Sequence, residues 1–288
     1  MTLNVEAEAD VRVAAVGPLR VARRALGVLL QRWPTVIAVL VVLHAYLAVF
    51  GICAVSSAPW CPPVLDRGDW FGTSGYYISN MLATILSASA WALGAAVLLP
   101  RLAASWPDRK GADGAPPRFS PVALGRCLAV GLVFAAVASL ASVPLWYLSF
   151  RDGGFDPSSR YWNDLSFVES VYGFASSVAL APVKYLMIVA IVHDGLPIVP
   201  AFAQARDAIT GWTSTVAAPL WLLQLLQPGT LWSIAFLTLP SSLIVPIVEF
   251  PPAIGLLRFA DAVVVVFTLA LALGLWRDVC GATSEATA

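Results

Sequence analysis

The sequence predicts an all-α membrane protein, a polytopic bundle of about six transmembrane helices. Of its 288 residues, 59% are hydrophobic and only 12% are charged, whereas soluble domains average about 45–50% apolar and about 25% charged residues. The mean hydropathy is +0.80. The apolar residues also gather in runs long enough for helices to cross a hydrocarbon core about 30 Å thick. These observations exclude a soluble globule and a disordered chain.

The apolar runs divide the chain into three parts. Residues 1–33 form a cytoplasmic N-terminal segment, residues 34–278 the transmembrane domain, and residues 279–288 a short cytoplasmic tail. One crossing needs roughly 20 helical residues. Six spans are predicted on that basis, at residues 34–55, 77–99, 121–150, 167–192, 212–249 and 253–276.

The fifth predicted span is broken. Residues 212–249 form an apolar stretch too long for one simple crossing, and it is interrupted by Pro219, Pro228, Pro240 and Pro246. A proline inside a helix removes a hydrogen bond and clashes with the preceding turn, and backbone freed within a membrane must be satisfied by protein or water. One crossing plus a short membrane-buried helix gives six spans in total, and two full crossings give seven.

The basic residues predict the orientation of the chain. Arg20, Arg23 and Arg24 precede the first span, and Arg109 and Lys110 lie between the second and third. Short cytoplasmic loops carry the excess of Lys and Arg in membrane proteins, so both termini are predicted to face the cytoplasm. An even number of spans agrees with this orientation.

Three similar stretches precede spans one, three and five, at residues 19–27, 120–126 and 201–212. Each combines arginine with small and apolar residues. In the first, apolar residues recur at helical spacing, with the arginines off that stripe, at Leu19, Ala22, Leu26, Leu29 and Trp33. This pattern is typical of a helix lying in the membrane interface. Either the chain repeats an interfacial helix plus a two-span hairpin three times, or common residue types produce the similarity by chance.

Three segments in the C-terminal third carry a family resemblance: AFAQARDAITGW at 201–212, IAFLTLP at 234–240 and GLWRDV at 274–279. Over about residues 196–278, the chain resembles the bacterial six-span membrane domain associated with glycerophosphoryl diester phosphodiesterases. In that family the hydrolase is a separate soluble barrel, which these 288 residues do not encode. The resemblance therefore implies a non-catalytic domain in a bacterial inner membrane, and it transfers no site residue.

Polar residues inside the spans are the candidate functional residues, namely His44, Lys184, Gln224, Gln227, Arg258 and Asp261. A charge within the membrane is costly unless it is paired or hydrated. Lys184 either extends its long side chain to the cytoplasmic surface or has a functional role. Arg258 and Asp261 either neutralise each other on one helix face or line an outward-facing vestibule. His44 either packs in the core or relays protons, and the two glutamines are predicted to line a polar cavity.

Two cysteines and two rows of small residues complete the predicted sites. Cys53 and Cys61 fall on the outer side, where a disulfide forms readily; otherwise, Cys53 is a small apolar residue of its helix. Small residues at four-residue spacing let helix backbones approach closely. They predict tight packing of spans three and four, through Gly131, Ala135 and Ser139 on one and Gly173, Ser177 and Ala181 on the other.

The motif search favours a non-enzymatic function. The sequence has no His-Glu-x-x-His, phosphate-binding loop, dinucleotide fingerprint or Cys-x-x-Cys, so no catalytic residue, metal or cofactor is predicted. Lys and Arg number 17, as do Asp and Glu, so nucleic acid is not an expected partner. The expected partners are membrane lipids and other membrane proteins or a second copy of the chain. The leading hypothesis is a scaffold, assembly factor or accessory subunit. The alternative is a small transporter or permease component with a polar site near Lys184 and the broken fifth span.

Overall fold

The computed structural model describes residues 17–42, 89, 91–106, 119–138, 140, 143–144, 147, 160–210, 216–228, 230–231, 234 and 251–286. Every regular element within these residues is a helix, as the sequence predicts. The labelled helices are α2 (Pro18–Gln31), α5 (Pro121–Ala138), α7 (Arg160–His193), α8 (Ile198–Thr210), α9 (Ala218–Leu226) and α12 (Pro251–Ala286). Two further helices cover Trp33–Val42 and Trp91–Ala104.

Proline marks the start of several of these helices. Pro18 begins α2, Pro121 begins α5, and Pro219 lies in the first turn of α9. Proline is favoured there because the amide that it lacks has no partner within the first helical turn. Pro182 is different, since it lies inside α7 without ending the helix.

Three helices are long and apolar enough to cross a membrane: Pro121–Ala138 in α5, Val171–His193 in α7 and Phe259–Arg277 in α12. A fourth candidate is the pair formed by α2 and Trp33–Val42, which is bent by 84°. The protein is therefore a helical membrane-type protein. Residues 43–55, 77–88 and 235–249 of the other predicted spans lie outside the described residues.

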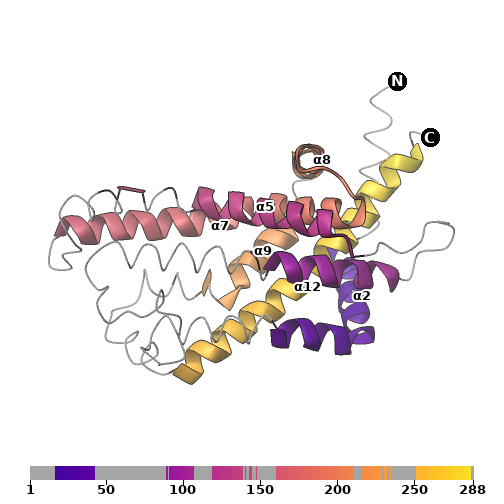
Figure 1. The fold of residues 1–288 in the computed structure, drawn as a ribbon, viewed down its shortest axis with the longest axis horizontal. Coiled ribbons are helices and arrows are strands. Elements are labelled where there is room, and N and C mark those ends of the chain that lie inside the picture. Colours follow the sequence, from indigo (N-terminus) through magenta and orange to yellow (C-terminus); the bar gives the residue numbers. More distant parts are fainter. Residues whose placement is uncertain are drawn as a thin grey trace.

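The helices α5 and α7 lie side by side and run in opposite directions (Figure 1). At one end, the Tyr172 hydroxyl donates a 3.2 Å hydrogen bond to the Val137 carbonyl oxygen, near the end of α5. At the other end, Arg126 near the start of α5 donates to the Gly195 carbonyl oxygen just after α7, over 2.7 Å. The pairing of these two helices expected from the sequence is present.

Gly173 lies where α7 meets the end of α5. A Cβ added to Gly173 would lie 4.0 Å from the Ala138 carbonyl oxygen, so the two backbones approach closely at this level. Ser139 of the predicted row lies outside the described residues. The packing roles of Gly131, Ala135, Ser177 and Ala181 stay predictions.

The remaining helices complete the bundle around α7. Trp276 of α12 donates to Asp194, at the end of α7, over 2.8 Å, and α9 packs against both α7 and α12. The indole of Trp221 in α9 donates to the Ala179 carbonyl oxygen of α7, over 3.4 Å. Helix Trp91–Ala104 ends beside α12, where the Ala103 carbonyl accepts a hydrogen bond from Arg277.

The helices α2 and α8 lie across the end of the bundle at which α7 ends. Figure 1 shows α8 seen along its axis, at a steep angle to α7. The 84° bend between α2 and the next helix turns the chain from this crossing direction into the bundle. Of these two helices, α2 packs on α12 and α8 packs on α7.

The helices of the apolar core pack most tightly where α2, α12 and the end of helix Trp91–Ala104 meet. A Cβ on Gly274 would lie 2.6 Å from Val21 Cγ1 and 2.7 Å from two ring atoms of Trp106. These distances are shorter than carbon atoms tolerate, so the contact needs a glycine. The first and last of the described helices, α2 and α12, are therefore in direct contact.

Two sequence expectations differ from the structure. Residues 121–126 form the first turns of α5 and not a separate interfacial helix, because no helix-breaking residue separates them from the apolar run. The stripe predicted on α2 is also divided. Leu29 is buried with Val21, Ala25 and Val28, while Leu19 and Leu26 are exposed. The reason is that α2 packs one face on α12, which sequence periodicity alone does not reveal.

Candidate functional site

Lys184 lies inside the α7 span against two aromatic rings. Its Nζ is 4.5 Å from the centre of the Trp91 ring and 5.6 Å from that of Tyr185. The two rings pack edge to face, with centroids 5.8 Å apart. A cation over an aromatic face is stabilised by the ring quadrupole, and more strongly so away from water. Helix Trp91–Ala104 thus supplies a specific partner for this intramembrane cation.

Trp91 also carries an unsatisfied donor. Its indole Nε1 is buried and has no hydrogen-bond partner among the described residues. A buried donor without a partner costs about 1–3 kcal/mol. Lys184 and Trp91 together therefore present one positive charge and one donor within the bundle, at the position where the sequence placed a candidate polar site.

Gln224 and Gln227 come together at the end of α9. Gln224 Nε2 donates to Gln227 Oε1 over 2.7 Å, and it lies 3.4 Å from Thr230 Oγ1. Gln227 is extended and ends the helix just before Pro228, as residues before proline tend to be. The two amides therefore bond to each other at the end of the helix, just before the break, where the sequence predicted them to line a polar cavity.

The other sequence candidates are only partly visible. His44, Cys53 and Cys61 lie outside the described residues, as does the side chain of Arg258. Asp261 is partly buried on α12 and makes an interaction of its own. The structure thus brings the two glutamines together and places Lys184 against Trp91 and Tyr185.

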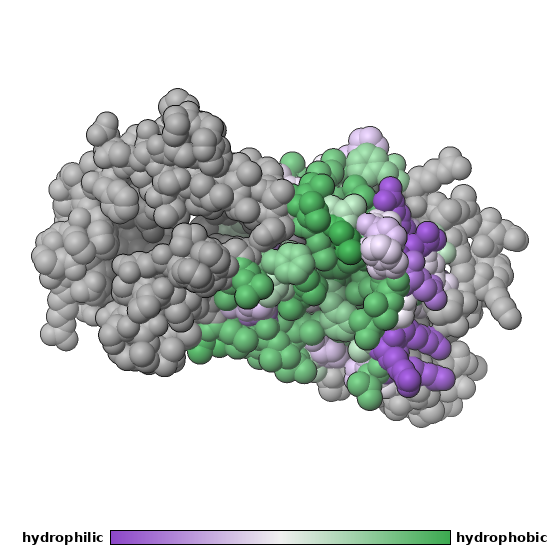
Figure 2. All heavy atoms as spheres, turned by 90° about the horizontal axis from the view of Figure 1, so that it is seen from below, coloured by the Kyte–Doolittle hydropathy of each residue, from purple (hydrophilic) through white to green (hydrophobic). Residues whose placement is uncertain are grey.

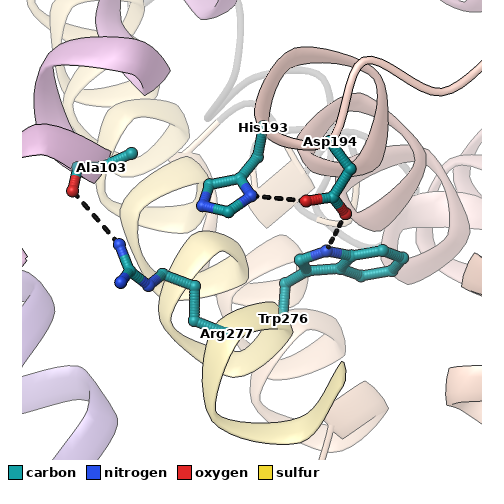
Figure 3. Close-up of polar contacts among 5 residues, drawn as sticks. All are labelled: Ala103, His193, Asp194, Trp276 and Arg277. Carbon is teal, nitrogen blue, oxygen red and sulfur yellow. Dashed lines mark hydrogen bonds and ion pairs between the residues drawn. The ribbon is translucent and has the colours of Figure 1, made fainter. Parts of the chain in front are cut away.

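A polar cluster that the sequence analysis missed lies at the turn between α7 and α8. One oxygen of the Asp194 carboxylate, Oδ1, lies 2.6 Å from His193 Nδ1. The other, Oδ2, accepts a 2.8 Å hydrogen bond from the Trp276 indole (Figure 3). Gly195 follows at φ +71°, a left-handed conformation that glycine adopts without strain. A carboxylate fixed by two helices thus anchors the end of α7.

Arginines bind backbone carbonyl groups at one helix end and at one turn between helices in this region. Arg126 Nη1 donates to the carbonyl oxygens of Gly195 and Leu196, over 2.7 and 3.1 Å. Arg277 Nη1 donates to the Ala103 carbonyl over 3.2 Å (Figure 3). Ala103 is in the last turn of helix Trp91–Ala104, and the last carbonyls of a helix lack partners within it and carry partial negative charge. We call Arg126, His193, Asp194, Trp276 and Arg277 the polar collar.

The residues of the polar collar join helices to one another. The hydrogen bonds donated by Arg126, Trp276 and Arg277 each hold a helix end, or the turn after it, to another element. Among the residues that the structure describes, no group of three or more His, Cys, Asp or Glu side chains is arranged to hold a metal ion. A glycine shortly after an apolar run is a recognised sign of a helix end. Gly195, three residues after Val192, is the signal that sequence reasoning passed over.

Comparison with known proteins returned no relative. No family model, no curated protein and no solved structure matches the chain. The resemblance to the phosphodiesterase-associated membrane domain stays a prediction.

Proposed function

We propose that the protein is a non-catalytic, multi-pass integral membrane protein that serves as a scaffold, assembly factor or accessory subunit for other membrane proteins. The supporting observation is the exposed surface of α5. In the apolar, membrane-spanning part of α5, 22% of the residues are buried, against 56% in the corresponding part of α7 and 61% in that of α12. Val133 on this helix is 60% exposed. An apolar spanning helix with so few buried residues leaves a broad face for lipids and for the helices of a partner.

The polar groups within the bundle support the same proposal. The two glutamines at the end of α9 bond to each other, and Lys184 rests on Trp91. Polar side chains that satisfy one another stabilise a fixed structure. A substrate pathway instead needs groups that remain available to a moving solute.

We place the protein in a bacterial inner membrane with six spans and both termini in the cytoplasm. Hydrophilic residues gather at one end of the described bundle (Figure 2), the end that α2 crosses in Figure 1. An excess of arginine on one side of a membrane protein marks the cytoplasmic side. The start of α2 and the last turns of α12 both belong to this end.

Site-specific cross-linking in native membranes tests the scaffold proposal. A photoreactive maleimide is attached to Val133→Cys on α5 in a cysteine-free background. Val263→Cys, an exposed position on α12, is the matched control. We expect a discrete protein adduct from Val133→Cys and lipid adducts alone from Val263→Cys. Lipid adducts alone from both positions would refute the assignment of α5 as a partner surface.

A small transporter or permease component is the second candidate, and it is favoured by Lys184 with the unsatisfied Trp91 donor. The test is proton flux into vesicles that contain the purified protein and a pH-sensitive dye. A transporter of this kind loses flux in a folded Lys184→Ala variant. Flux equal to that of empty vesicles for both forms of the protein would remove proton transport from consideration.

A further inference from the structure

Helix α2 has three distinct faces. Val21, Ala25 and Val28 are buried against the bundle. A second face is apolar but exposed, with Leu19 at 83%, Leu26 at 49% and Leu30 at 64% exposure. Leucines exposed together on one side of a helix mark a surface that contacts a membrane or another protein. In a membrane protein, a face of this kind lies in the hydrocarbon just below the headgroups.

Two exposed arginines border the exposed leucine face. At 3.6 residues per turn, Arg23 falls next to Leu19, Leu26 and Leu30, and Arg20 lies beside it toward the third, polar face. Both arginines are exposed. The stretch Pro18–Gln31 contains no acidic residue, so its positive charge is not compensated within the helix. Figure 2 shows hydrophilic residues gathered at this end, beside the broad hydrophobic surface.

The crossing helix α8 provides an internal contrast. It also buries one face, through Ala201, Ala205 and Ala208. Its arginine, Arg206, is paired with the adjacent Asp207, with Nε and Nη2 lying 2.9 and 2.7 Å from the same carboxylate oxygen. Of the two crossing helices, α2 is therefore the one with exposed arginines and no carboxylate.

We infer that α2 binds anionic phospholipids, with Arg20 and Arg23 contacting the headgroup phosphates while Leu19, Leu26 and Leu30 enter the acyl region. The inference rests on the proposed integral membrane function and names the lipid class that the protein recognises. The guanidinium group suits this role because its planar donors match phosphate oxygens in pairs. A basic residue near an anionic membrane surface strengthens binding by about fivefold.

The test is a lipid titration of the full-length protein in a mild neutral detergent, followed by native mass spectrometry. The two probes are phosphatidylglycerol and phosphatidylcholine with identical acyl chains. We expect the protein to bind phosphatidylglycerol more tightly. The double variant R20Q/R23Q is expected to lose between about fivefold and about thirtyfold of that affinity, with its phosphatidylcholine binding unchanged.

Two control variants separate this site from general charge effects. R20K/R23K keeps the positive charge and should retain most of the preference for phosphatidylglycerol over phosphatidylcholine. R206Q removes an arginine that is already paired, so the same preference should be unchanged in that variant. Equal binding of the two lipids by the unmodified protein would overturn the inference. A loss of phosphatidylglycerol affinity in R206Q as large as that in R20Q/R23Q would overturn it as well. The scaffold proposal fails on a different readout, the protein adduct at Val133, so either can fail alone.

Discussion

The helices α2 and α8 both cross the same end of the bundle, yet they are attached in different ways. The helix α2 is held by apolar contact, where Val21 and Trp106 meet the backbone of α12 at Gly274. The helix α8 follows α7 through a turn held by polar contacts, with Asp194 fixed by Trp276 and the turn carbonyls bound by Arg126. Close packing depends on the shape of a few atoms, whereas a hydrogen-bonded turn depends on satisfying particular groups. The two attachments should therefore fail under different substitutions.

The largest loss of stability is expected from Gly274→Leu. A side chain at this position overlaps Val21 and the Trp106 ring, at distances of 2.6 and 2.7 Å from the Cβ alone. Overpacking of this kind costs about 1–3 kcal/mol and occasionally more. Thermal unfolding in detergent, followed by circular dichroism, measures the loss.

The matched control for this change is Gly27→Ala, on the outer side of α2. A Cβ there meets no atom within 4 Å, so stability should stay the same or rise by up to about 1 kcal/mol. Equal melting temperatures for Gly274→Leu and the unmodified protein would show that α2 is not held by this contact.

A smaller effect is expected from Asp194→Ala in the polar collar. The change removes the acceptor of the Trp276 indole and the partner of His193. A buried donor left without a partner costs about 1–3 kcal/mol, and Trp276 is 3% exposed. We expect lower stability and faster proteolysis at the turn between α7 and α8. A cleavage pattern identical to that of the unmodified protein would contradict the anchoring role of the carboxylate.

The smallest effect is expected from Gly195→Ala. The glycine has φ +71°, and the left-handed conformation costs other residues roughly 1–2 kcal/mol. Its neighbouring space is open, since a Cβ meets no atom within 4 Å. The loss should therefore come from backbone strain alone. Gly125→Ala in α5, where a Cβ also meets open space, is the control without a positive φ. If both variants unfold at the same temperature, strain at this turn is negligible.

The sequence predicted the parts of this structure that depend on local pattern. Long apolar runs predicted the spanning helices in α5, α7 and α12. Helical periodicity with arginines predicted α2. The same information did not separate the buried Val21 from the exposed Leu26, because both are apolar and only the packing on α12 distinguishes them.

The candidate site was harder to predict than the fold. Lys184 was identified because it is a charge in an apolar run, but its partner Trp91 lies on another helix. A single sequence contains no signal for that pairing. The bond between Asp194 and Trp276 depends in the same way on how separate helices come together. The pairing of Gln224 with Gln227 can be predicted in part from the sequence, since the two residues are one helical turn apart.

The contact at Gly274 has a consequence for biosynthesis. Val21 belongs to the first described helix of the chain, and its packing partner is near the end of the last. The ribosome releases Val21, Ala25 and Val28 long before α12 is made, so this apolar face lacks its α12 partner while the helices between are inserted. This contact forms only when α12 has been made, so this assembly step depends on synthesis of the chain through Gly274. A polypeptide truncated before Gly274 would retain the spanning helices in α5 and α7, but it would lose the α12 contact and leave the apolar face of α2 accessible to quality-control proteases.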